Sequence, residues 1–127
     1  SIIVAVRNEE KNVDALLESL SQQSYSKDLF QVIIIDDYSE DETWNKLTQF
    51  NPRGLNTLFT RLSDHTNEGE IIQSHKKKAI ETGIKLAKGT LIVTTDADCL
   101  FPVDWLITIA RFYEKNNATF KNGKYNK

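Results

Sequence analysis

The stretch "TLIVTTDADC" at residues 90–99 decides the fold, because it joins a run of apolar and β-branched residues to two carboxylates. Such a run predicts a buried strand over residues 90–95. Side chains alternate along a strand, so Asp96 and Asp98 are expected on the same side. Two like charges held together need a compensating partner. The pair therefore predicts a divalent cation, an Arg or Lys, or a shared proton at this position.

Similar apolar runs recur along the chain and alternate with amphipathic segments. This alternation is typical of βα units, and it predicts an α/β fold, a three-layer α/β/α sandwich around a mostly parallel, Rossmann-like sheet. The expected strands cover residues 2–6, 32–35, 55–62 and 90–95. The expected helices cover residues 10–22, a segment that starts near Ser39, residues 71–88 and residues 104–115.

Several local features carry expectations of their own. Ser39 and Glu42 have capping-box spacing, which predicts the start of a helix that directs Trp44 inward. Gly89 is the expected C-terminal stop of the third helix, whose apolar side is expected to include Ile84. The remaining expectations are that Trp105 belongs to the core, that Cys99 is a small buried residue, and that His65 and His75 have surface or packing roles.

Composition narrows the function classes. The chain has 127 residues, with 39% hydrophobic and 27% charged residues and a formal charge of −2, so nothing favours nucleic acid as a partner. A single cysteine favours a reducing compartment. No run reaches the roughly 20 apolar residues that cross a bilayer. We expect residues 1–127 to form one domain, a truncated piece of a longer protein.

Polar or acidic residues follow three of the expected strands, in "RNEE", "DDYSED" and "DADC". In an open parallel α/β sheet, ligands bind beyond the carboxyl ends of the strands. Several carboxylates gathered there would repel one another unless a cation joined them. This arrangement predicts Mg²⁺ or Mn²⁺ together with a phosphate-bearing ligand.

Four segments in order, "SIIVAVRNEE", "QVIIIDDYSEDET", "HKKKAIETGIKLAKG" and "LIVTTDAD", resemble the nucleotide-sugar-binding half of the inverting family 2 glycosyltransferases. The resemblance implies a GT-A type fold and covers the chain to about residue 113. It implies that Ala5, Arg7 and Glu9 contact the nucleoside. It also implies that Asp37 recognises the base, whereas Asp36 is structural.

The same resemblance places Lys76 near the nucleotide, although this chain has His75 and Glu81 where family members often carry Gly and Asn. Asp98 is implied as the direct metal ligand, and Asp96 as a second ligand or a partner of the ribose hydroxyls. The donor implied is a nucleoside-diphosphate sugar, with a UDP-sugar favoured because a uracil ring offers one N–H to Asp37. The catalytic base is expected beyond Lys127, so the piece is expected to be inactive alone.

The implied acceptor is a saccharide or a lipid-linked molecule, and the implied location is the cytoplasmic face of a membrane. Two rival classes stay open. A sugar-phosphate nucleotidyltransferase would share the sheet and the metal, but it would normally carry a Gly-rich phosphate loop after the first strand, where "VRNEEKN" has no glycine. A non-enzymatic receiver-like signalling module would need a lone Asp rather than D-A-D. A dinucleotide-binding Rossmann domain is disfavoured because the glycines never form G-x-G-x-x-G.

Overall fold

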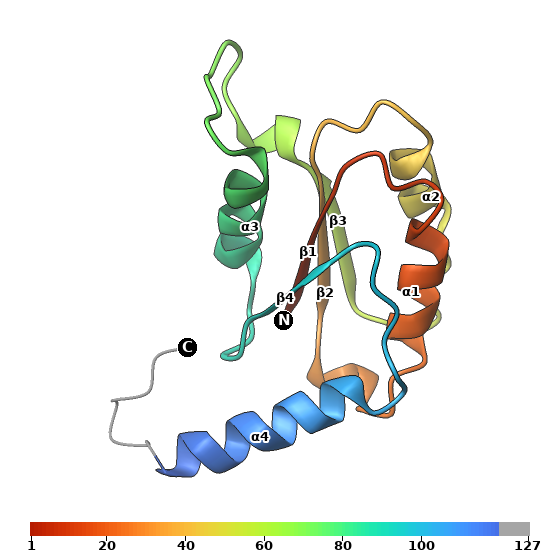
Figure 1. The fold of residues 1–127 in the computed structure, drawn as a ribbon, viewed down its shortest axis with the longest axis vertical. Helices are drawn as coiled ribbons and strands as arrows, with labels where there is room; N and C mark the ends of the chain where they lie inside the picture. The colour runs from red at the N-terminus through yellow and green to blue at the C-terminus, as the bar shows by residue number, and fades with distance from the viewer. Residues whose placement is uncertain (120–127) are drawn as a thin grey trace.

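A parallel sheet of four strands organises the protein (Figure 1). The computed structural model describes residues 1–119. The strands stand in the order β3-β2-β1-β4, and β1 pairs with both β2 and β4. Their bounds are Ile2–Val6 (β1), Val32–Asp36 (β2), Thr57–Arg61 (β3) and Val93–Asp96 (β4).

Helices cover both faces of this sheet (Figure 1). Helices α1 and α2 lie on one face, α3 lies on the other, and α4 crosses the end of the sheet at which the strands begin. The predicted three-layer α/β arrangement is therefore confirmed. The α-helices span Val13–Ser21 (α1), Thr43–Gln49 (α2), His75–Leu86 (α3) and Trp105–Thr119 (α4), and 3₁₀ turns span Lys27–Leu29 and Leu62–His65.

Strand alternation divides the apolar side chains between two cores. Ile2, Val4 and Val6 of β1 face α1, whereas Ile3 faces α3. Because both faces of β1 and β2 are covered, these strands are apolar almost throughout. Trp44 and Trp105, both predicted as core residues, are partly buried against the α1 side.

Strand β4 differs from the prediction of a buried strand over residues 90–95. It is shorter, and among the described residues it pairs with β1 alone. Thr94 and Asp96 are exposed as a result. The apolar and β-branched sequence correctly indicated a strand, but it did not reveal that the strand lies at the edge of the described sheet.

The predicted capping box at Ser39 is wrong. Helix α2 starts at Thr43, whose backbone N–H donates to Asp41 Oδ1 at 2.9 Å, and Glu42 makes no capping hydrogen bond through its side chain. The Ser39 hydroxyl instead accepts from the Asn8 backbone N–H at 2.8 Å. A contact between two loops therefore replaces the local one that the spacing suggested.

Helix α3 approaches the sheet through small residues. A Cβ added at Gly83 would lie 2.5 Å from Ile3 Cγ2, so a larger residue would push the helix outward. Ile84, expected on the apolar side, is 47% exposed. The predicted stop at Gly89 is also wrong, because the helix ends at Leu86 and Ala87 is already extended.

No helix within residues 1–119 has the length and apolar character needed to cross a membrane.

Candidate functional site

A hollow of about 440 Å³ lies at the carboxyl ends of β1, β2 and β4. Every residue that the sequence predicted at the nucleotide or the metal lines this carboxyl-end hollow. Asp37 and Asp98, which come from different strand ends, thus share one cavity. The lining residues are Ala5, Val6, Arg7, Glu9, Asp37, His75, Lys76, Asp96, Ala97 and Asp98.

The loop after β1 is tied to the loop after β2. Asn8 adopts a left-handed conformation with φ 52°, which Asn tolerates better than most residues. Its side-chain Oδ1 accepts from the Glu40 backbone N–H at 2.7 Å, and the Glu9 backbone N–H donates to Thr43 Oγ1 at 2.8 Å. These bonds hold the segment that carries Arg7 and Glu9 against the second loop.

Asp37 is positioned by both backbone and side-chain contacts. Its backbone N–H donates to the Val6 carbonyl at 2.8 Å, which extends the pairing of β1 with β2 by one residue. The side chain is only 6% exposed, and Oδ1 lies 2.7 Å from His75 Nδ1. This predicted base-recognition residue is therefore a buried acid held in one orientation.

His75 is a residue of the site that sequence reasoning missed. It was expected to have a surface or packing role, but it starts α3 and lines the carboxyl-end hollow beside Lys76. Its ring also meets the edge of the Tyr38 ring, with centroids 5.4 Å apart. The available signal was its position directly before a lysine expected at the nucleotide, because the first turn of a helix that follows a strand end faces the same crevice.

Lys76 connects α3 to the acid pair. Its Nζ donates to Asp96 Oδ1 at 2.7 Å, and this hydrogen bond together with the charge of Asp96 raises the pKa of Lys76. Both side chains are more than half exposed, so the pair contributes little to stability. The sequence predicted a divalent cation, an Arg or Lys, or a shared proton beside Asp96 and Asp98. The structure shows a lysine there, Lys76.

Asp98 lies in a turn beyond the end of β4. The turn, rather than strand alternation, therefore brings it into the same hollow as Asp96. Cys99 is exposed, contrary to the prediction, because the chain has already left the sheet. Within residues 1–119 no group of three or more His, Cys, Asp or Glu residues is arranged to hold a metal ion. Two carboxylates nevertheless fit Mg²⁺ or Mn²⁺, since Mg²⁺ is usually held by one or two carboxylates and substrate phosphates.

Asp36 lies outside this hollow although it precedes Asp37. It is 3% exposed, and its Oδ1 has no hydrogen-bond partner among the described residues. Burial raises the pKa of Asp36, and hydrogen bonding from Ser39 and the charge of Arg61 oppose this rise. The guanidinium of Arg61 lies 4.6 Å from the centre of the Trp44 ring. These contacts suit the structural role expected for Asp36.

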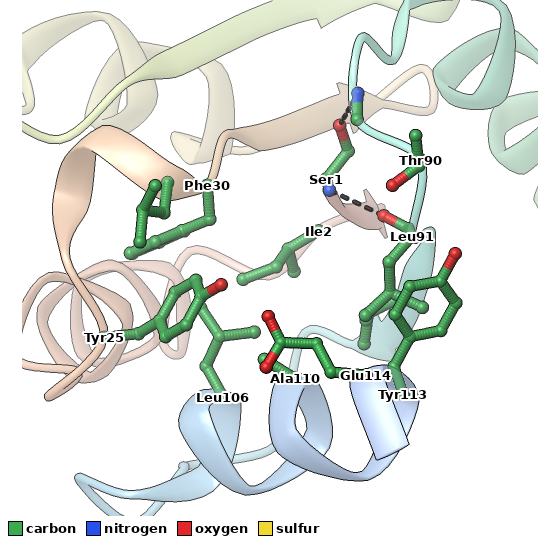
Figure 2. A pocket seen from close by; sticks show the side chains of 13 residues that line it. Ser1, Ile2, Tyr25, Phe30, Thr90, Leu91, Leu106, Ala110, Tyr113 and Glu114 are labelled. Carbon is green, nitrogen blue, oxygen red and sulfur yellow. Dashed lines mark hydrogen bonds between the residues drawn. The ribbon is translucent and has the colours of Figure 1, made fainter. Parts of the chain in front are cut away.

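A second hollow, of about 170 Å³, lies at the opposite end of the sheet (Figure 2). It is bounded by the starts of β1 and β4 and by α4. In Figure 2 the side chains of Ile2, Leu106 and Ala110 line it together with aromatic rings. Among the described residues that line it, this amino-end hollow has the acid Glu114 but no pair of carboxylates, so they do not provide the donor set of a cation–phosphate site.

The family model "Glycosyl transferase family 2" matches residues 1–124. The chain belongs to glycosyl transferase family 2. This membership favours a glycosyltransferase over the nucleotidyltransferase and the receiver-like module.

Curated relatives agree with this family. A probable glycosyltransferase of Sulfolobus acidocaldarius is 32% identical over 117 residues, covering 91% of this chain and 23% of the relative. Glycosyltransferase AglE of Haloferax volcanii is 28% identical over 106 residues, covering 84% and 32%. The poly(ribitol-phosphate) β-N-acetylglucosaminyltransferase TarS of Staphylococcus aureus is 29% identical over 118 residues, covering 93% and 19%. The chain therefore spans a third or less of the length of these relatives.

Solved structures share the fold. S. aureus TarS residues 1–349 superpose with a TM-score of 0.73 at 29% identity, covering 90% of this chain and 32% of that one. The same enzyme has been solved with UDP and with UDP-GlcNAc, at TM-scores of 0.70 and 0.69. A mannosyltransferase of Pyrobaculum calidifontis, in complex with GDP-Man and Mn²⁺, has a TM-score of 0.71 at 24% identity, covering 88% and 31%. At that identity the mannosyltransferase supports the fold alone.

Proposed function

We propose that this family 2 chain is the donor-binding part of an inverting glycosyltransferase, and that its carboxyl-end hollow binds a nucleoside-diphosphate sugar, preferably a UDP-sugar. The observation that carries the proposal is that Asp37, Lys76 and Asp98 line one hollow although they come from three different segments. The TarS complexes with UDP and UDP-GlcNAc support a uridine donor in a structure of the same fold.

Each part of the donor has a chemical counterpart among the lining residues. The Asp37 carboxylate accepts a hydrogen bond from a base N–H, and Ala5, Arg7 and Glu9 lie along the nucleoside. The Lys76 ammonium faces the diphosphate, whose negative charge it offsets. Asp96 serves the ribose hydroxyls or shares the cation, and its contact with Lys76 keeps both side chains at the same rim.

Asp98, with Asp96 as a second ligand, would hold Mg²⁺ or Mn²⁺ against the diphosphate. A bound divalent cation stabilises the negative charge that develops on a departing nucleoside diphosphate. The contribution of the protein is to present the Asp96 and Asp98 carboxylates and the Lys76 ammonium together at one rim of the hollow. The diphosphate completes the ligand set.

Inverting transfer also needs a base that deprotonates the acceptor hydroxyl. We place this base beyond Lys127, so residues 1–127 bind the donor without turning it over. The acceptor proposed is a saccharide or a lipid-linked molecule at the cytoplasmic face of a membrane. Two relatives are named as a poly(ribitol-phosphate) β-N-acetylglucosaminyltransferase and a β-monoglucosyldiacylglycerol synthase, and their names support a polymeric or a lipid acceptor.

Calorimetric titration of the chain with UDP, with and without Mn²⁺, tests the proposal. We expect binding that weakens about tenfold or more when the metal is removed, which corresponds to roughly 1.4 kcal/mol. Asp98→Ala should reproduce this loss in the presence of Mn²⁺. Asp64→Ala, which removes an exposed acid outside the hollow, is the matched control and should bind like the parent chain.

Two results would contradict the proposal in different ways. If no binding is detected at about 1 mM UDP, the dissociation constant exceeds about 1 mM and the binding free energy is weaker than roughly −4 kcal/mol. The donor-binding function is then wrong. If UDP binds equally well with and without metal, and equally to the Asp98→Ala variant, the donor site stands and the metal role is wrong.

A further inference from the structure

One oxygen of the Asp37 carboxylate is already occupied. Oδ1 lies 2.7 Å from His75 Nδ1, and a carboxylate only accepts hydrogen bonds, so Nδ1 carries the proton and donates. A hydrogen bond to a charged acceptor is stronger than a neutral one. His75 therefore holds Asp37 in place and uses part of its capacity to accept.

The imidazole is held from two directions. His75 is the first residue of α3, where the Ser74 side chain caps the helix by accepting from the Lys77 backbone N–H. On the other side, the Tyr38 ring meets the imidazole at an interplanar angle of 74°. The side chain is 35% exposed, so it is partly buried at the wall of the hollow. These contacts keep Nδ1 directed at Asp37.

The second oxygen, Asp37 Oδ2, is open to the hollow. Asp37 Oδ2 has no hydrogen-bond partner among the described residues. It is not buried away from solvent, because the only buried and unpartnered side-chain oxygen in that part of the chain is Asp36 Oδ1. Asp37 itself lines the carboxyl-end hollow. The site consequently presents one wholly free acceptor oxygen to a base, because Oδ1 already spends part of its accepting capacity on His75.

The number of free acceptors distinguishes the bases. A uracil ring presents a single N–H between two carbonyl groups, which one carboxylate oxygen satisfies. Guanine presents two adjacent donors, N1–H and the exocyclic amine, which a carboxylate meets best with one oxygen for each donor. An Oδ1 that already accepts from His75 is a poorer acceptor for the second donor. Cytosine presents a lone pair at its ring nitrogen, which the carboxylate repels.

We propose that His75 sets the base selectivity of the donor site by occupying Asp37 Oδ1, so that the remaining oxygen favours uridine over guanosine nucleotides. This inference rests on the proposed donor-binding function and deepens it. His75 is a positioning residue here, because it acts on the base through Asp37. A donor site of this kind takes a uridine diphosphate sugar.

Selectivity is measured by titrating UDP and GDP, each with Mn²⁺, into the parent chain and into two variants. The parent should prefer UDP by about tenfold or more. In His75→Ala both Asp37 oxygens are released, and the UDP-to-GDP affinity ratio should fall by about tenfold. His75→Asn should retain most of the preference, because its amide N–H replaces the Nδ1 donor.

The control is His65→Asn. His65 follows β3, and its Nε2 contacts Thr60 Oγ1 at 2.9 Å outside the hollow, so the ratio should not change. A purely structural role of His75 would weaken both nucleotides equally and leave the ratio intact, which overturns the inference while the donor site stands. If neither nucleotide binds to the parent chain, the proposed function fails and this inference fails with it. Circular dichroism of each variant verifies that the fold is retained.

Discussion

Charged side chains line the hollow at the carboxyl ends of the strands, whereas apolar and aromatic side chains dominate the hollow at their amino ends. The first hollow is also the larger, at about 440 Å³ against about 170 Å³. Both are built on the same strands, since β1 and β4 contribute residues to each. The chemical contrast therefore comes from the segments that enter and leave each strand.

The direction of the parallel strands explains this contrast. A right-handed crossover leaves one strand at its carboxyl end and returns at the amino end of the next, so the connecting helix begins at the carboxyl end. Helix α3 accordingly places His75 and Lys76, its first residues, at the carboxyl-end hollow. At the amino end, α4 packs Leu106 and Ala110 toward the starts of the strands. One end of the sheet thus carries charged side chains around its hollow, and the hollow at the other end is mainly apolar.

The largest expected effect comes from the apolar end. Leu106 is 4% exposed within the core, and its backbone N–H donates to Gln23 Oε1 at 2.9 Å. Leu106→Ala should lower the free energy of unfolding by about 2–4 kcal/mol through lost burial and a residual cavity. Urea denaturation measures this change. Leu100→Ala, at a position 68% exposed, is the control and should change stability by about 0.5 kcal/mol or less.

The same variant can break the comparison. If folded Leu106→Ala loses tenfold or more in UDP affinity, the amino-end hollow contributes to donor binding and the two ends are not functionally separate.

A smaller effect is expected at the charged end. Lys76→Gln should weaken UDP binding about three- to tenfold, because it removes the ammonium proposed to face the diphosphate. It should change stability by less than about 1 kcal/mol, since the Lys76–Asp96 pair is exposed. Titrations at about 50 and 200 mM salt should show a weaker salt dependence in the variant. Lys77→Gln, which neutralises the exposed lysine next along the helix, should leave binding unchanged, and an equal loss would assign the effect to general surface charge.

The smallest effect concerns Asp36. Burial raises its pKa above the ordinary value of 3.8, so the folded chain binds more protons than the unfolded chain above that pH. The carboxyl of Asp36 therefore lowers stability as pH rises through the interval between the ordinary and the raised pKa. Asp36→Asn should remove this decrease and raise the free energy of unfolding at pH 7 by at most about 1 kcal/mol, because the amide occupies the same unpartnered position. Denaturation at a series of pH values measures it, and a stability–pH curve identical to that of the parent would refute this account.

Much of the fold was predictable because the apolar periods are strong. The β1 and β2 runs, covered on both faces, and the Val13, Leu16, Leu17 and Leu20 stripe of α1 identify their elements directly. Boundaries were less predictable. Ser39 has the right spacing for a helix cap, yet its hydroxyl serves Asn8 across a loop, and no local pattern contains that contact.

The candidate site divides in the same way. The residue types and their places after the strands indicated Asp37, Asp96 and Asp98, because parallel strands bring their ends to one edge. Lys76 was indicated by the resemblance to the family 2 glycosyltransferases alone. The pairing of Asp37 with His75 was beyond sequence reasoning, since the two are 38 residues apart and α3 alone brings them together.

The amino-acid sequence by itself determined which segments form strands and helices and which strand ends carry acids, because periodicity and residue chemistry are local properties. Tertiary structure alone decided that β4 lies at the edge of the described sheet, that Cys99 is exposed, and that one oxygen of Asp37 is taken by an imidazole. Those outcomes depend on how α3 and the loops pack against the sheet, and packing joins residues whose separation along the chain no local pattern encodes.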